Sequence, residues 1–230
     1  MNEGKLVPTV RTTFSVYDMT KAMIEAWQEI YGVLPQKKSI CVMLGQWSIE
    51  TGVGKYCFNN NIGNVKKLNG FDYFALDNVW EIINGKKVIL PRTDPGSWFV
   101  SFPTLKDGVK HHMMFLKNKR YKMSWVAVEN GDPVLFARLL KQQGYYTASE
   151  ADYIRAVSGF YNQYMRSNDF EKIIEELSKP ITTEMIPQPQ SITSIQSPEA
   201  EHAVKNIEVG NFELSIWQKV QDKFYNLFKK

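Results

Sequence analysis

The chain has 230 residues, of which 43% are hydrophobic and 23% are charged, values typical of a folded domain with an appendage. Its formal net charge of +4 suits an anionic surface but is too small to indicate a nucleic-acid-binding protein. With two cysteines and three histidines that lack metal-ligand spacing, we expect no disulfide framework, no metal site and no cofactor.

The N-terminal residues 1–14 lack the apolar core of a secretory signal peptide. No apolar run in the sequence is long enough to predict a transmembrane helix. Residues 5–13 favour an extended arm or an edge strand instead. If the protein acts outside the cell that makes it, we therefore expect it to be carried there as part of another particle or exported by a non-classical route.

Two helices are predicted next. Residues 15–31 carry apolar side chains at three- to four-residue spacing, which predicts an amphipathic helix that Gly32 ends. The following helix is apolar on several faces, so we expect it to be central and buried. Gly52 and Gly54 end it, because glycine best tolerates the left-handed conformation after a helix.

Glu50 is predicted to lie on the last turn of this second helix, beside the apolar Trp47 and Ile49. The negative end of the helix dipole and the loss of water around apolar neighbours both raise the pKa of a carboxyl group. A general acid requires such a protonated carboxyl group near neutral pH. Considered without the rest of the sequence, Glu50 fits a second interpretation better: an ordinary solvent-exposed glutamate at a helix end, with no catalytic role.

A loop rich in asparagine and glycine follows Glu50. Its asparagines surround Gly63, in a segment too polar for a core: they are Asn59, Asn60, Asn61 and Asn64. Carboxamides in a cleft suit hydroxyl and acetamido groups, so we predict that this loop binds a sugar.

Residues 64–100 favour a small lobe of β-structure, with Asn-Gly pairs at 69–70 and 84–85. Residues 80–88 predict a β-hairpin with a type I′ turn at the second pair. Four carboxylates of this lobe are candidates for a second catalytic group, which glycoside hydrolysis typically needs, and the pattern alone does not separate them. They are Asp72, Asp77, Glu81 and Asp94.

The remainder of the domain, to about Ser178, is predicted to be helical. Capping residues mark the starts of three of its helices, and a glycine marks one end: Thr104 with Asp107, Asp132 before Pro133, Ser149, and Gly144.

Residues 179–211 are rich in Pro, Ser, Thr and Gln and predict a linker. Residues 212–230 predict an amphipathic helix. Docking onto its own domain or a sister subunit is the preferred interpretation, and a partner-protein anchor or an interfacial membrane helix are alternatives.

Five motifs in this order resemble the glucosaminidase branch of the lysozyme-like superfamily, whose members cut the glycan strands of bacterial peptidoglycan. The motifs are E-T-G-V-G at 50–54, N-N-I-G at 60–63, W-E-I-I-N-G-K at 80–86, Arg120-Tyr121, and a G-Y motif at 144–153. The resemblance covers about residues 27–164. It implies an α+β, mainly α fold with two lobes, one of which is a small β-hairpin lobe.

The resemblance also implies roles for individual residues. Glu50 takes the position of the catalytic acid, and Glu81 matches the second carboxylate on the hairpin, with Asp77 in reserve. Tyr145 matches the tyrosine that lines the cleft near the acid, and Tyr146 is the alternative match for that tyrosine. We group the remaining candidates as substrate-binding residues: Trp47, Asn60, Asn61, Gly63, Asn64, Tyr121 and Tyr146. The adjacent His111 and His112 are expected to be structural.

The sequence thus predicts a peptidoglycan hydrolase, most simply an endo-β-N-acetylglucosaminidase that belongs to a phage lysin or virion. A muramidase or a lytic transglycosylase on the same fold is the nearest alternative. A structural virion or wall-binding protein with a vestigial domain is an alternative of another class. It would retain wall binding and release no sugar fragments.

Overall fold

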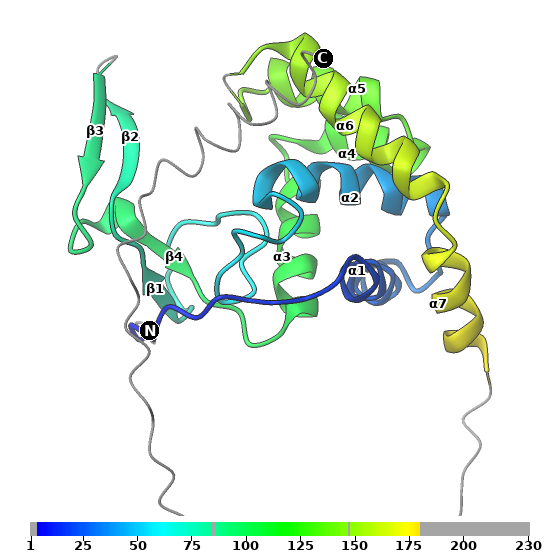
Figure 1. Ribbon diagram of the computed structural model, residues 1–230, viewed down its shortest axis with the longest axis horizontal. Coiled ribbons are helices and arrows are strands. Elements are labelled where there is room, and N and C mark those ends of the chain that lie inside the picture. Colours follow the sequence, from blue (N-terminus) through cyan, green and yellow to red (C-terminus); the bar gives the residue numbers. More distant parts are fainter. Residues whose placement is uncertain (1–3, 84–85, 147, 180–230) are drawn as a thin grey trace, which may run out of the picture.

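The computed structural model describes residues 4–83, 86–146 and 148–179 of the chain. The Asn84-Gly85 turn, nearly all of the predicted linker and the predicted C-terminal helix lie outside these residues. The described part is an α+β, mainly α lysozyme-like fold, with a helical lobe and a smaller β lobe (Figure 1). This confirms the predicted fold class. No helix among the described residues is long and apolar enough to cross a membrane.

Seven helices and four short strands follow one another in the described chain. In order they are α1 (Val16–Tyr31), α2 (Lys37–Thr51), β1 (Tyr73–Ala75), β2 (Val79–Ile83), β3 (Lys86–Leu90), the 3-10 turn η1 (Pro95–Ser97), β4 (Trp98–Val100), α3 (Leu105–Lys117), α4 (Lys122–Asn130), α5 (Pro133–Gln142), α6 (Glu150–Met165) and α7 (Asp169–Ser178).

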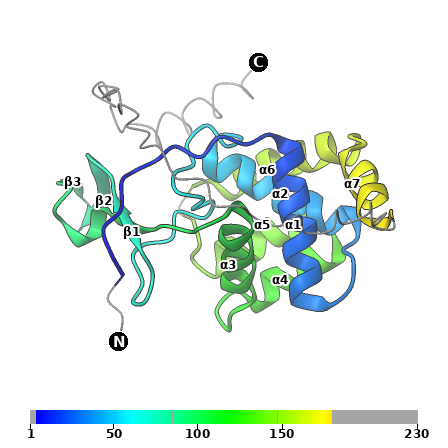
Figure 2. The same ribbon diagram turned by 90° about the horizontal axis from the view of Figure 1, so that it is seen from below.

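Helix α2 is the centre of the helical lobe, as its apolar faces predict. It packs against α1 on one side and against α4, α5 and α6 on the other (Figures 1 and 2). Its residues from Ser39 to Ser48 are all buried, and Trp47 is only 1% exposed. A helix covered on several sides is held by tertiary packing, so the end of α2 is a fixed point in the fold.

Side-chain caps explain where several helices begin. Thr104 and Asp107 form the predicted reciprocal capping box at the start of α3. Ser15 and Asp18 form another at the start of α1, which was not predicted from the sequence. Asp132 accepts hydrogen bonds from two backbone N–H groups at the start of α5, where proline occupies the first helical turn.

The β lobe consists of two separate antiparallel pairs. Strand β1 pairs with β4, and β2 pairs with β3. In the second pair Ile83 is opposite Lys86, so two residues connect the strands, as the Asn-Gly signal predicts. This β2–β3 hairpin stands at the edge of the molecule, away from the helical lobe (Figure 1).

The N-terminal arm, residues 4–14, joins the two lobes (Figure 2). It forms isolated bridges, Leu6 with Tyr73 and Arg11 with Phe58, rather than a regular strand. The backbone N–H of Thr12 also donates to the carbonyl of Cys57, at 3.0 Å. These contacts tie the arm both to strand β1 and to the polar loop that follows α2.

Candidate active site

Glu50 lies on the last turn of α2, and the chain turns sharply immediately after it. Gly52 has a φ of 60° and caps the helix in the left-handed conformation, and Gly54 has a φ of 79°. The Thr51 hydroxyl accepts a hydrogen bond from the Gly54 N–H at 2.9 Å. The sequence therefore places a carboxyl group at the end of a rigid helix, next to a tightly held loop.

Burial raises the pKa of Glu50 to about 7, because protein atoms displace water from around its carboxyl group. Hydrogen bonding from Tyr145 and from Tyr153 acts in the opposite direction and lowers this pKa. The side chain keeps part of its surface exposed, so solvent and a ligand can reach it. A partly exposed carboxyl group with a pKa near neutrality is able to donate a proton to a bound substrate.

The two tyrosines reach Glu50 from different parts of the helical lobe. Tyr145 follows α5 and stacks edge-on against Tyr121, with ring centroids 5.5 Å apart. Tyr153 lies in the first turns of α6 and stacks on Tyr146 at 3.9 Å. Burial, followed by the Glu50 charge, holds the pKa of both hydroxyls well above the usual value, so both remain protonated donors.

In the described part of the chain, the Tyr153 hydroxyl influences Glu50 without a hydrogen bond of standard geometry. The Tyr153 hydroxyl is buried and makes no hydrogen bond of standard geometry within the described residues. Its influence on Glu50 is therefore that of a nearby dipole at longer range. Hydrogen bonds in ligand-free active sites are often long and tighten when substrate binds.

Gln46 and Tyr153 belong to this site although sequence reasoning did not include them. Gln46 precedes Glu50 by four residues, which places both side chains on the same face of α2. That spacing is a signal available in the sequence. Tyr153 is the last residue of the G-Y motif, and its position there is the corresponding signal.

The asparagine loop uses most of its carboxamides to hold its own backbone. The Asn61 side chain, 2% exposed, donates to the carbonyls of Val65 and Val100, both at 2.9 Å, and accepts from the Val65 N–H. The Asn60 amide donates to the Phe102 carbonyl at 2.9 Å. Asn64 is partly exposed, and unlike the amides of Asn59 and Asn60 its side chain holds no other part of the described chain by a hydrogen bond, so it is the best placed of these asparagines to reach a sugar.

Of the three predicted substrate-binding aromatic residues, two lie inside the protein and Tyr146 is partly exposed. Trp47 is 1% exposed and Tyr121 is 4% exposed, so both belong to the core that supports the site. The Tyr146 hydroxyl donates to the carbonyl of Ala137 at 3.0 Å. Trp47 and Tyr121 are therefore too buried to stack on a sugar in this conformation, and one face of the Tyr146 ring is covered by Tyr153.

The competing carboxylates of the β lobe each have a local structural role. Asp72 accepts from the Lys5 N–H at 2.8 Å, and Asp77 forms an ion pair with Arg92 at 3.2 Å. Asp94 caps η1 by accepting from the Gly96 N–H at 2.7 Å.

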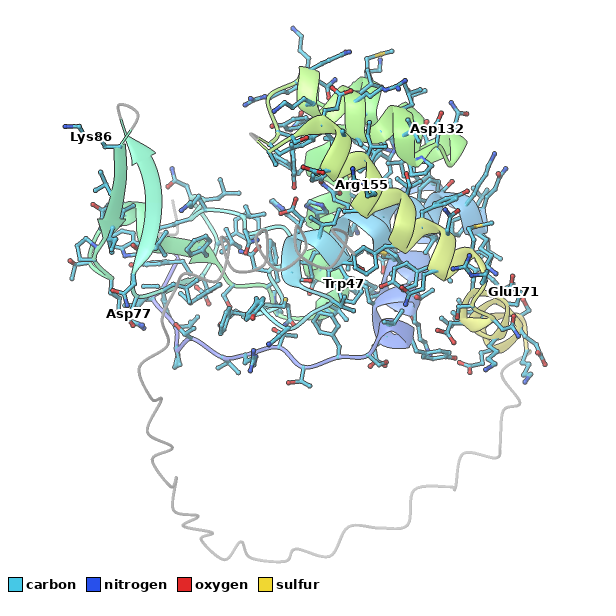
Figure 3. The ribbon with its side chains drawn as sticks, turned by 45° about the horizontal axis from the view of Figure 1, so that its top comes forward. Trp47, Asp77, Lys86, Asp132, Arg155 and Glu171 are labelled. Carbon is cyan, nitrogen blue, oxygen red and sulfur yellow. The ribbon has the colours of Figure 1, made fainter. Side chains whose placement is uncertain are left out.

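Glu81 lies on β2, directly opposite Val88 of β3, and its side chain is outside the description. Figure 3 shows the hairpin, with Asp77 near its base and Lys86 near its tip, standing apart from α2, on which Trp47 is labelled. The structure thus gathers Glu50 and the two tyrosines at one place. It leaves Glu81 as a proposal based on its place in the hairpin.

Among the described residues, no group of three or more His, Cys, Asp or Glu side chains is arranged to hold a metal ion.

Comparisons with curated proteins and with solved structures gave no match. The family model described as mannosyl-glycoprotein endo-beta-N-acetylglucosaminidase matches residues 21–166, which is more than half of the chain and includes Glu50, the hairpin and Tyr153. The chain therefore belongs to the glucosaminidase family and is a glycoside hydrolase that acts on peptidoglycan.

Proposed function

We propose that this protein cleaves β-1,4 glycosidic bonds of the peptidoglycan strand on the reducing side of N-acetylglucosamine, with Glu50 as the general acid. The observation that carries this proposal is a carboxyl group with a pKa raised to about 7, in a glucosaminidase domain and beside two tyrosine hydroxyls. In this proposal, Asn64 of the neighbouring loop contacts the substrate.

Glu50 donates its proton to the glycosidic oxygen as the bond to the anomeric carbon breaks. The hydroxyls of Tyr145 and Tyr153 then stabilise the carboxylate that remains, because both lower the pKa of this carboxyl group, and in this proposal the Tyr153 contact shortens to a hydrogen bond when substrate binds. Glu81 stabilises the positively charged sugar or activates the attacking water. The substrate's own 2-acetamido group is the alternative nucleophile.

The test is digestion of purified peptidoglycan, with the products reduced and identified by mass spectrometry. Reducing-end N-acetylglucosamine from the wild type, absent with Glu50→Gln, is the expected result. Reducing-end N-acetylmuramic acid would instead identify a muramidase, and an anhydro-muramic end would identify a lytic transglycosylase. Retained wall binding with no released fragments from the wild type would refute the enzymatic proposal and favour a wall-binding role.

The role of Glu81 is tested with a matched control on the same lobe. We expect Glu81→Gln to lower kcat about 100-fold or more, since it removes a catalytic carboxylate. Asp77→Asn removes an exposed carboxylate that pairs only with Arg92 among the described residues, and it should leave kcat near the wild-type value. The reverse pattern would move the assignment to Asp77, and nearly full activity in both variants would favour a single-acid transglycosylase.

A further inference from the structure

A buried carboxamide lies directly behind the proposed acid. Gln46, one turn before Glu50 on α2, is 0% exposed. Its side-chain oxygen is 3.2 Å from Nε2 of His112, which comes from α3. Its side-chain nitrogen is buried and makes no hydrogen bond of standard geometry within the described part of the chain. A buried side-chain amide whose oxygen has a hydrogen-bond partner and whose nitrogen has none is unusual and requires an explanation.

The position of His112 is fixed on both sides. The residue is 2% exposed, and burial lowers its pKa to about 4, so the ring is neutral at pH 7. A Cβ atom on Gly63 would lie only 2.4 Å from His112 Nδ1, so the backbone of the asparagine loop packs directly against the ring. With one proton and the Gln46 oxygen as partner, the neutral ring donates from Nε2.

The His112 contact determines which way the Gln46 amide faces. Because its oxygen is held by the ring, its nitrogen points to the other side, where the amide lowers the pKa of the Tyr145 and Tyr153 hydroxyls. An N–H group has this effect when it donates toward a phenol oxygen, since it stabilises negative charge there. The Tyr153 hydroxyl, like the Gln46 nitrogen, is buried and makes no hydrogen bond of standard geometry within the described residues, so an unsatisfied donor and an unsatisfied hydroxyl lie in the same buried site. A hydroxyl that accepts from Gln46 is left to donate its own proton to Glu50.

We propose that Gln46, anchored by His112, is a positioning residue that orients the Tyr145 and Tyr153 hydroxyls toward the Glu50 carboxyl group. This inference rests on the proposed role of Glu50 as the acid. It adds a connection from the sugar-binding loop, through Gly63 and His112, to the group that donates the proton.

The central variant is Gln46→Met, which keeps the volume and removes the amide. The expected result is a fall in kcat of roughly 10- to 100-fold with KM little changed, because a misplaced donor affects the transition state more than substrate binding. Ser48→Ala is the matched control, since Ser48 is also buried on α2 but bonds to Tyr164, at 2.7 Å. Its kcat should stay near the wild-type value.

A second readout does not depend on activity. In the full-length protein with 13C-labelled glutamate, the titration of the Glu50 carboxyl group is followed by NMR. With Gln46→Met the midpoint should rise by roughly one unit, because the tyrosine donors that lower the pKa lose their orientation. The titratable groups around this carboxyl are Tyr145 and Tyr153, with Tyr121, Tyr146 and His112 one step further away. Burial keeps the hydroxyls of Tyr145, Tyr153 and Tyr146 protonated and the His112 ring neutral near pH 7.

A fall in activity with an unchanged Glu50 midpoint, matched by Ser48→Ala, would show that Gln46 only stabilises the fold and would overturn the proposal. If Gln46→Met fails to fold, His112→Phe provides the same test. It releases the anchor while keeping the amide, and the midpoint should move in the same direction, whereas an unchanged midpoint would refute the anchoring role. If the wild type cleaves no peptidoglycan, the proposed function fails, while the titration still decides whether Gln46 acts on Glu50.

Discussion

Replacing Glu50 with glutamine should remove activity and at the same time stabilise the protein above neutral pH. In the folded protein burial raises the pKa of this carboxyl group from 4.5 to about 7. One pKa unit corresponds to about 1.4 kcal/mol, so holding the charged form in the fold costs about 3 kcal/mol. Partial exposure of the side chain makes this an upper value, and about 2 kcal/mol is a realistic expectation.

The direction in which the stability difference between Glu50→Gln and the wild type changes with pH follows from proton linkage. A carboxyl group whose pKa is raised by folding favours the folded state below the unfolded pKa of 4.5, and this contribution is lost as the pH rises through about 7. Glutamine is neutral throughout. The gain in the free energy of unfolding should therefore be largest near pH 8 and close to zero near pH 4. Denaturant unfolding of both proteins at the two pH values measures it. A gain that is equal at both pH values, or a loss near pH 8, would refute the reasoning.

Two further predictions concern the chain that follows Glu50. Asn61→Ala should lower the free energy of unfolding by about 2 kcal/mol, because it removes the side-chain partner of the Val65 N–H and of the buried Val100 carbonyl, while the Val65 carbonyl still accepts from the Val100 N–H. A loss below about 0.5 kcal/mol in denaturant unfolding would contradict that role. Val53→Asn should raise stability by about 1 kcal/mol, since Val53 has a φ of 58°, which asparagine adopts more easily than a β-branched residue. An unchanged or lower melting temperature would show that Val53 is not strained.

Much of the helical lobe could be predicted because its signals are local. Thr104, Asp132 and Ser149 all cap helices at the predicted places, since a cap depends only on residues two or three positions apart. The register of the β2–β3 hairpin followed in the same way from one Asn-Gly pair.

The candidate site was harder to predict because long-range packing creates it. Glu50 was identifiable from its helix end, but the dominant cause of its raised pKa is burial, and α2 is covered chiefly by α6, which lies about 100 residues later in the chain. The asparagine loop carries a composition typical of a sugar site. Yet Asn61 is fully engaged by the backbone, which only the fold reveals. Composition does not distinguish an amide that binds a ligand from one that holds its own loop.

The most direct test of the account is the release of reducing ends from purified peptidoglycan by the wild type and by Glu50→Gln, from about pH 5 to about pH 9. If Glu50 is the general acid, wild-type kcat/KM falls at alkaline pH with a midpoint near 7, and Glu50→Gln has almost no activity at any pH. A wild-type rate that stays constant through pH 7, or a substantial rate in the variant, would contradict the assignment of Glu50 as the acid.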